Sequence, residues 1–466
     1  MVKATTAYVC QECGFSQPKW AGRCEACGGW NTMIEEVVAS AETLRETKGK
    51  RGRKLAFVPL AGESPPLARR QTGIAEFDRV TGGGLVPGAA LLIAGDPGIG
   101  KSTLLLQVAA RLSDAAECVY ISGEEAVDQL RLRADRLGIR AASLHLAAAT
   151  SVGDIAATLD RPDGPEVIII DSVHTLFVDA IESTPGSVAQ VRAASQVLIR
   201  LAKRRGFVLL LVGHVTKEGM IAGPKVLEHM VDPVLSFEGA RGPQFRILRA
   251  TKNRFGATDE IGVFEMSDAG LREVTNPSAL FLADRGHDTP GSAVFAGLEG
   301  TRPLLCEVQA LIAPSALGTP RRAVVGWDAG RLAMILAVLE SRAGLALGAF
   351  DVFLNIAGGL RVSEPAADLA VAAALASASL QRPLPPETVV FGEIGLGGEV
   401  RAVARPDARL KEAAKLGFLH AVVPVQKRGG AGGGLTLHEV AHAADLLARV
   451  RAGARSDRRE RRVGHA

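Results

Sequence analysis

From Thr72 onward, short apolar runs rich in Val, Ile and Leu alternate with longer helical stretches. Four of these runs predict strands, at residues 90–94, 118–122, 167–170 and 208–212. Strands that alternate with helices build a parallel sheet with helices on its faces. The pattern therefore predicts an α/β fold.

Two changes in composition divide the chain. Four of the six cysteines fall in the first 27 residues, and a polar, charged segment follows from Glu35 to Lys54. Another α/β region begins after Asn276-Pro277, and 466 residues are too many for one core. We expect a cysteine module at 1–34, a linker at 35–60, α/β domains at 61–275 and 279–452, and a basic disordered tail at 453–466.

The overall composition excludes some classes of protein. Apolar residues make up 47% of the chain and charged residues 22%, which is ordinary for a folded α/β protein. A net charge of +4 is too small to establish a nucleic-acid partner, and the basic stretches 48–54 and 449–462 are interpreted as a solvated linker and chain end. The chain has no apolar run of about 20 residues and no secretory signal, so we predict a cytoplasmic protein without membrane contact.

The N-terminal cysteines form two CxxC pairs, Cys10 with Cys13 and Cys24 with Cys27, separated by ten residues. This spacing lets four thiolates converge on one Zn²⁺ in a site without an open coordination position, so the metal would be structural. Paired disulfides are the alternative, and they require an oxidising compartment. We expect the surface between the pairs, which carries Lys19, Trp20 and Arg23, to contact either DNA or a protein. Cys118 and Cys306 lie in apolar runs and are interpreted as buried packing residues.

A phosphate-binding loop follows the first strand. The sequence GxxxxGKS begins directly after the run 91–94 and leads into a helix, which is the context expected of a Walker A motif. Its backbone N–H groups wrap phosphates, Lys101 reaches the β and γ oxygens of ATP, and Ser102 ligates Mg²⁺. The predicted nucleotide-binding residues are Gly95, Asp96, Pro97, Gly98, Ile99, Gly100, Lys101, Ser102 and Thr103.

Acidic residues end the neighbouring strands. Asp171 follows four apolar residues, so it is the predicted Walker B carboxylate beside Mg²⁺; a turn aspartate is the alternative. Glu124 follows the run 119–121 and is the predicted group that orients the attacking water; a helix-capping acid is the alternative. His214 ends another apolar run, where it either senses the γ-phosphate or is structural.

The whole chain resembles the bacterial RadA (Sms) family of recombination and repair proteins. The resemblance rests on the cysteine ribbon, the Walker A loop, Gly123-Glu124-Glu125, Asp171-Ser172, residues 213–219, residues 252–256 (KNRFG) and a C-terminal region similar to the Lon protease domain. It implies a RecA-like ring, hexameric, that binds single-stranded and branched DNA. It also implies that ATP hydrolysis drives branch migration alongside the RecA recombinase.

The KNRFG segment is a signature needed for activity in this family. Lys252 and Arg254 flank a turn-forming Asn and are predicted to reach the γ-phosphate of a neighbouring protomer, as arginine fingers do; an ordinary basic turn is the alternative. Two polar segments, 183–192 and 216–225, suit loops that face the DNA channel of a ring, although each also fits an ordinary surface connection.

The C-terminal region lacks the protease dyad. Ala366 stands where the Lon-type nucleophilic serine is expected, and Asp407 falls nearest the expected lysine. The nearby Lys411 and Lys415 lie on a predicted packing helix, 408–416. We expect a scaffold for ring assembly, with DNA contacts from basic residues such as Arg321 and Arg322.

Three function classes remain after this reading. The favoured one is a DNA-remodelling ATPase. An ATP-dependent protease is disfavoured because both dyad positions differ. A RecA-like ATPase that acts as a protein scaffold or timer is the third, and its ATP turnover would not respond to DNA.

Overall fold

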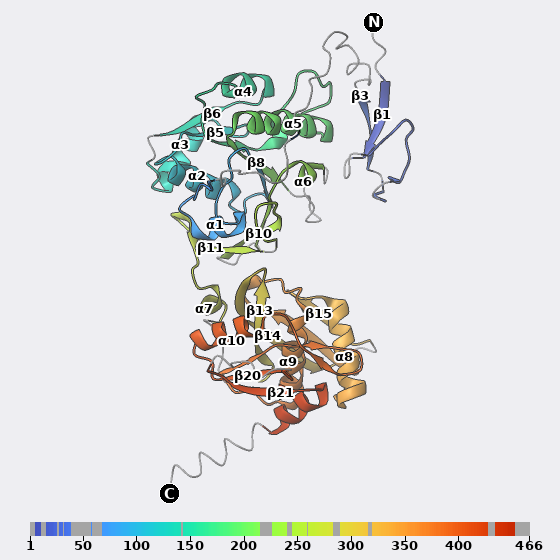
Figure 1. Ribbon diagram of the computed structural model, residues 1–466. Coiled ribbons are helices and arrows are strands. Elements are labelled where there is room, and N and C mark those ends of the chain that lie inside the picture. Colours follow the sequence, from blue (N-terminus) through green and yellow to red (C-terminus); the bar gives the residue numbers. More distant parts are fainter. Residues whose placement is uncertain are drawn as a thin grey trace. The chain divides into compact units, whose positions relative to one another are not determined.

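The computed structural model describes residues 5–10, 15–25, 28–30, 32–38, 57, 68–140, 143–214, 226–239, 245–258, 260–282, 289–315, 319–426 and 434–452 (Figure 1). The chain divides into two compact units, Met1–Val274 and Thr275–Ala466. The second unit thus begins at Thr275, close to the composition change at Asn276-Pro277.

The N-terminal module is a small antiparallel sheet. Its strands are β1 (Thr5–Cys10), β2 (Ser16–Gln17) and β3 (Met33–Val38), in the order β2-β1-β3. Cys10, Cys24 and Met33 form its buried cluster, with Tyr8 packed against them. So small a core needs an additional constraint to hold it.

Within the described residues, the rest of the first unit is built on one sheet of nine strands in the order β12-β11-β10-β9-β4-β8-β7-β5-β6. The parallel part contains β4 (Ala90–Gly95), β5 (Cys118–Ser122), β6 (Leu144–Ala148), β7 (Val167–Asp171), β8 (Val208–His214) and β9 (Val234–Glu238). An antiparallel extension follows: β10 (Phe245–Lys252), β11 (Ile261–Ser267) and β12 (Gly270–Glu273).

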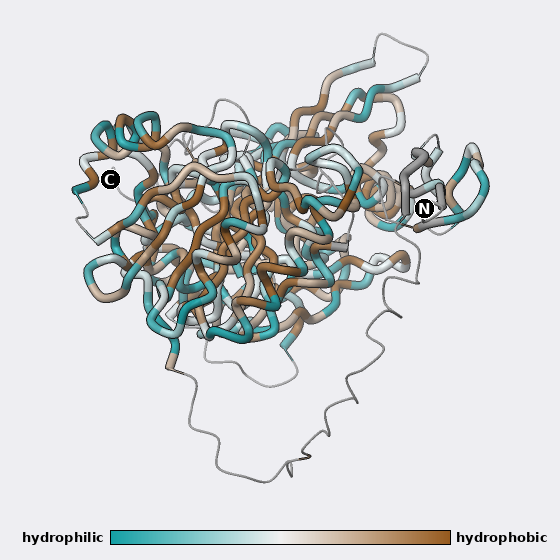
Figure 2. The backbone as a smooth tube through the Cα atoms, turned by 90° about the horizontal axis from the view of Figure 1, so that it is seen from above, coloured by the Kyte–Doolittle hydropathy of each residue, from teal (hydrophilic) through white to brown (hydrophobic). Residues whose placement is uncertain are grey.

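Helices cover both faces of this sheet because its central strands are apolar on both sides. Along β4, Leu91 and Ile93 join one core, and Ala90 and Leu92 join the other. The first core is covered by α1 (Ala75–Thr81), α2 (Lys101–Leu112) and α3 (Val127–Arg136). The second is covered by α4 (Val152–Leu159), α5 (Val188–Arg205) and α6 (Val226–Met230). Figure 2 shows the hydrophobic stretches that supply these cores.

The second unit has a mixed sheet of seven strands among its described residues, in the order β15-β16-β14-β13-β17-β20-β21. They are β13 (Ser292–Glu299), β14 (Arg302–Pro314), β15 (Arg322–Val325), β16 (Phe350–Ile356), β17 (Thr388–Val390), β20 (His420–Pro424) and β21 (Thr436–Val440). A separate pair joins β18 (Glu393–Ile394) to β19 (Val400–Arg401).

The labelled helices of this unit are α7 (Pro277–Phe281), α8 (Ala329–Ala343), α9 (Asp368–Leu380) and α10 (Pro406–Lys415), and residues 443–452 are also helical. The central one, α9, is rich in alanine and buried from Asp368 to Ala378. The packing helix predicted at 408–416 is α10, which begins two residues earlier because Pro406 suits a first helical turn. Within the described residues, no helix combines the length and apolarity needed to span a membrane.

Candidate active site

The predicted phosphate-binding loop lies at the carboxyl end of β4, and α2 begins at Lys101. Gly98 and Gly100 adopt positive φ angles of 78° and 118°, which favour glycine. A Cβ at Gly95 would come within 2.7 Å of the Phe237 carbonyl oxygen on the adjacent strand β9. Glycine is therefore required sterically where the loop leaves the sheet.

Lys101 is only 5% exposed and points back into its own loop. Its ammonium group donates hydrogen bonds to the carbonyl oxygens of Gly95, at 2.7 Å, and Asp96, at 3.0 Å. Burial lowers the pKa of Lys101, and the negative charges of Asp171, Glu124 and Asp96 oppose this effect. The predicted Walker A lysine and both predicted catalytic acids therefore act on one another electrostatically.

Asp171 ends β7 beside β5, and its carboxylate is tied to a residue that the sequence did not single out. The Tyr120 hydroxyl donates to Asp171 Oδ2 at 2.5 Å. The pKa of Tyr120 is raised well above its usual value, chiefly by burial and then by the Asp171 charge, while a hydrogen bond from Ser102 lowers it. The structure thus brings Ser102, Tyr120 and Asp171 together. In the sequence, the one sign that Tyr120 belongs to the site is a phenol within an otherwise apolar strand.

The two glutamates after β5 have separate partners. Glu124 is exposed, and one of its carboxylate oxygens accepts a hydrogen bond from Ser172 Oγ at 2.5 Å. Glu125 instead forms an ion pair with Arg133 of α3. Ser122 Oγ accepts hydrogen bonds from the backbone N–H groups of both glutamates, which fixes the turn. Glu124 is therefore the acid directed toward Asp171-Ser172.

His214 is the last residue of β8 and pairs with Gly95 at the start of the phosphate loop. This register puts its backbone at the nucleotide end of the sheet. Its side chain lies outside the described part of the structure, so γ-phosphate sensing stays a prediction.

Lys252 and Arg254 lie at the opposite end of the sheet. Lys252 pairs with Val234 at the start of β9, whereas Gly95 is beside Phe237 at the other end of that strand. The Lys252 ammonium group donates to the carbonyl oxygens of Glu228 and Val231, the latter at 2.7 Å. Burial, followed by the Arg254 charge, lowers the pKa of Lys252.

Arg254 forms an ion pair with Asp232 at 3.3 Å, and its side chain is 56% exposed. Asp232 is almost buried and also accepts a hydrogen bond from the N–H of Ala90, the first residue of β4. Three residues of strand correspond to roughly 10 Å. Neither basic residue therefore lies beside the phosphate loop of its own protomer.

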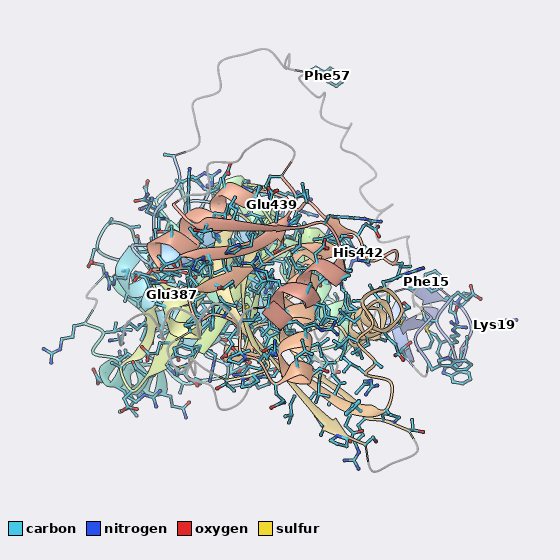
Figure 3. The ribbon with its side chains drawn as sticks, turned by 90° about the horizontal axis from the view of Figure 1, so that it is seen from below. Phe15, Lys19, Phe57, Glu387, Glu439 and His442 are labelled. Carbon is cyan, nitrogen blue, oxygen red and sulfur yellow. The ribbon has the colours of Figure 1, made fainter. Side chains whose placement is uncertain are left out.

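Of the four predicted zinc ligands, Cys10 and Cys24 are buried together, and Cys13 and Cys27 lie outside the described residues. Short backbone hydrogen-bonded turns flank both cysteines: the Cys10 N–H donates to the Phe15 carbonyl, and the Gly28 N–H donates to the Cys24 carbonyl. Two thiols in one small core fit the zinc prediction. Phe15 and Lys19 are seen on this module in Figure 3.

The first predicted DNA loop leads into α5. Gln190 is buried and holds it: its side chain accepts from the Val178 N–H and donates to the carbonyls of Ile181 and Ser183 at 2.9 Å. Ser187 caps the helix by accepting from the Gln190 N–H. Arg192 is exposed one turn into α5. The whole of the second predicted loop, 216–225, lies outside the described residues.

The position of the missing protease serine is closed. Ala366 is 1% exposed and lies at the N-terminal side of α9 in η4 (Pro365–Ala367), and Asp407 is exposed on α10. Arg409 is fully buried, forms a two-pronged ion pair with Glu364 and donates to the Ala296 carbonyl at 2.9 Å. Its guanidinium lies 5.5 Å from the centre of the Phe391 ring. The sequence did not predict this buried cation.

The exposed basic candidates of the second unit differ from one another. Arg322 donates to the carbonyls of Phe350 and Leu347, so its guanidinium is used within the fold. The backbone N–H of Arg321 donates a hydrogen bond to Asp351, and Arg321 is exposed to solvent. Arg321 is therefore the better placed of the two for an external contact.

Comparison with known proteins bears on these assignments. Residues 8–35 match the rubredoxin metal binding domain, and residues 60–220 match the AAA domain. DNA repair protein RadA of Brucella abortus (strain 2308) is 57% identical over 466 residues, covering 97% of this chain and 99% of its own. The chain belongs to the RadA family.

Other members of the RadA family give the same result. The proteins of Pseudomonas aeruginosa PAO1 and Bacillus subtilis 168 are 50% and 48% identical and cover 91% and 92% of this chain. A crystal structure of the RadB recombinase aligns with 44% of this chain and 99% of its own, at 20% identity and a TM-score of 0.36. The predicted α/β fold and N-terminal zinc ribbon are confirmed.

Proposed function

We propose that this protein is a DNA-dependent ATPase of recombinational DNA repair. It binds single-stranded and branched DNA and drives branch migration alongside the RecA recombinase, acting as a hexameric ring in the cytoplasm. The observation that carries the proposal is the convergence of Lys101, Asp171 and Glu124 at the carboxyl edge of a RadA-family sheet. The printed names of the relatives support a role in DNA repair.

The site's own residues divide the work of ATP hydrolysis. The loop amides and Lys101 bind the phosphates, and Lys101 exchanges its bonds to Gly95 and Asp96 for phosphate oxygens. Ser102 and Asp171 would hold Mg²⁺, and the bound metal would supply positive charge to neutralise the phosphates. Glu124, held by Ser172 and open to solvent, orients the attacking water and accepts its proton.

The position of Lys252 and Arg254 supports a ring. They lie at the end of the sheet away from their own phosphate loop, so they can serve a nucleotide only across a protomer boundary. A cation added from a neighbour stabilises charge in the transition state and couples adjacent sites. Segments 183–192 and 216–225 supply the channel contacts to the DNA backbone.

Steady-state ATP hydrolysis, measured with and without single-stranded DNA across a salt titration, tests this proposal. We expect DNA to stimulate turnover in the wild type, the stimulation to fade as salt rises, and Lys252→Ala to lose it. Lys203→Ala, an exposed lysine of α5, is the matched control and should retain stimulation. If the wild-type rate of ATP hydrolysis is the same with and without DNA, the protein is instead a scaffold or timer ATPase.

The second unit is proposed as a non-proteolytic, Lon-like scaffold for ring assembly. Ala366 offers no nucleophile, and the ion pair of Arg409 with Glu364 occupies the neighbouring interior. A lone serine placed at a 1% exposed position would have no base and no access to a peptide. Two observations therefore support a non-proteolytic domain: both dyad positions carry other residues, and the interior beside Ala366 is filled by the ion pair.

Zinc is the proposed structural metal of the ribbon, held by Cys10, Cys13, Cys24 and Cys27. We expect Cys24→Ser to reduce bound zinc from about one ion per chain to near zero, because one thiolate in four is lost. Metal analysis of purified protein measures this. Cys118→Ala, which removes a buried thiol outside the ribbon, should keep its zinc; loss of zinc in both variants, or in neither, contradicts the assignment.

A further inference from the structure

The second unit holds a cavity of about 450 Å³ on one face of its mixed sheet. Its lining side chains come from alternate positions of three neighbouring strands and so share that face: Glu307, Gln309 and Leu311 of β14, Phe353 and Asn355 of β16, and Val325 of β15. Leu311 is 63% exposed and Val325 59%, so solvent reaches the apolar wall. The proposed ATP hydrolysis uses none of these residues.

Glu307 is a charged residue of this lining, yet it is only 5% exposed. One of its carboxylate oxygens accepts a hydrogen bond from Ser292 Oγ, and the other accepts from the Gln309 amide at 2.9 Å. Gln309 in turn accepts from the Asn355 amide at 3.1 Å. Among the described residues, the partners of Glu307 are neutral donors and it forms no ion pair. A buried carboxylate normally has a cationic partner, because its desolvation is costly.

The rest of the lining suits the stem of a long cationic side chain. Leu311, Val325 and the Phe353 ring form an apolar wall. Arginine packs its methylene groups on such a surface while its charged end reaches a polar partner. The planar guanidinium carries five N–H donors, so it can bind the Glu307 carboxylate and a neighbouring amide oxygen together. The cavity therefore has the chemistry of an arginine site.

The described chain ends close to this cavity. In the helix of residues 443–452, the Arg451 carbonyl accepts a hydrogen bond from the Arg382 guanidinium. The Arg382 carbonyl accepts from Ser377 Oγ at 2.5 Å, and the same hydroxyl accepts from the N–H of Gly291 at 2.9 Å. Gly291 lines the cavity. Three hydrogen bonds thus connect the last helical turn to the cavity rim.

Residues 453–466 follow this helix and lie outside the described part of the structure. They contain five arginines and two acidic residues, so their charge is opposite to that of Glu307. A segment of this length spans up to roughly 45 Å when extended, which is ample to reach a neighbouring cavity. Tethering also gives it an effective concentration on the order of millimolar at the site, so even weak docking is populated.

We propose that the chain's own C-terminal segment, residues 453–466, docks on this sheet face and places an arginine against Glu307. The inference goes beyond the proposed function, because it concerns the second unit alone and does not depend on the ATP site. It gives a binding partner to a segment that its composition alone presents as a solvated chain end.

Limited trypsin digestion of the full chain tests the proposal, with initial cleavage rates at the arginines of 453–466 followed by mass spectrometry. We expect Glu307→Gln to raise these rates by about tenfold or more, because proteolysis follows the population of the undocked segment. The wild-type segment should also be cleaved much more slowly than a free peptide of the same sequence. Thermal unfolding checks that the variant is folded.

Leu311→Lys is a second variant that leaves the buried carboxylate untouched. It places a cation on the exposed wall of the cavity, so it should repel the segment and raise the same cleavage rates. Glu340→Gln is the matched control: Glu340 is an exposed acid of α8 outside the cavity lining, and its loss should leave the rates unchanged.

Three results would overturn the proposal. The first is a wild-type segment that is cleaved as fast as the free peptide, since that segment does not dock. The second is unchanged protection in both Glu307→Gln and Leu311→Lys, which would move the docking site away from this cavity. The third is an equal loss of protection in Glu340→Gln, which would reduce the effect to general charge attraction.

Discussion

Replacing Glu124 by Gln is expected to reduce kcat for ATP hydrolysis by about a hundred- to ten-thousandfold, the contribution typical of a positioned general base. The amide keeps the size of the side chain and can still contact Ser172, but it cannot accept a proton from water. Nucleotide affinity should remain close to that of the wild type, since the role proposed for Glu124 is in chemistry rather than in binding. Single-turnover hydrolysis and equilibrium ATP binding, measured separately, provide the check.

Glu125→Gln is the natural control for this experiment. The two acids are adjacent, share the Ser122 cap and differ in partner, because Glu125 is paired with Arg133. We expect Glu125→Gln to keep kcat within a fewfold of the wild type. A reversal of the two phenotypes would transfer the catalytic role to Glu125.

Replacing Arg409 by Ala should destabilise the C-terminal unit by about 3–5 kcal/mol, the cost of leaving one partner of a buried ion pair without the other. The substitution leaves the Glu364 carboxylate without its cationic partner and the Ala296 carbonyl without this hydrogen-bond donor. It also empties the space beside Phe391. Chemical denaturation of the full chain, followed by a probe in the C-terminal unit, measures the loss.

Lys411→Ala is the companion variant on the same helix. Lys411 is exposed on α10, two residues beyond Arg409, so its removal should change stability by about 0.5 kcal/mol or less. Comparable losses of unfolding free energy in both variants would mean that any substitution on α10 destabilises the unit. The buried ion pair would then not be the cause of the effect of Arg409→Ala.

The sequence predicted the part of the fold that repeats a simple rule. The strands β4, β5, β7 and β8 are apolar on both faces, and each was expected within two residues of its observed bounds. The strand β6 was not singled out, because it is only partly buried and its sequence is less apolar. The extension β10–β12 was also missed, since antiparallel strands beside a parallel sheet carry no helical segments between them.

The same limit applies to the site. Glycine and lysine spacing predicted the phosphate loop, because that chemistry lies in consecutive residues. Tyr120 was invisible: within an apolar strand its ring counts as core, and only the register of β5 against β7 brings its hydroxyl to Asp171. Arg409 was hidden for the opposite reason, because a charged residue on a helix is normally solvent-exposed.

Lys101 donates hydrogen bonds to two carbonyl oxygens of its own loop. The two carbonyls restrain the Lys101 side chain within the fold, so part of its conformational entropy is lost during folding and need not be lost on binding phosphate. Nucleotide association then becomes an exchange of acceptors on a rigid frame. The affinity contributed by Lys101 is the difference between its interaction with a charged phosphate and its bonds to two neutral carbonyls, which is smaller than the full strength of the phosphate interaction.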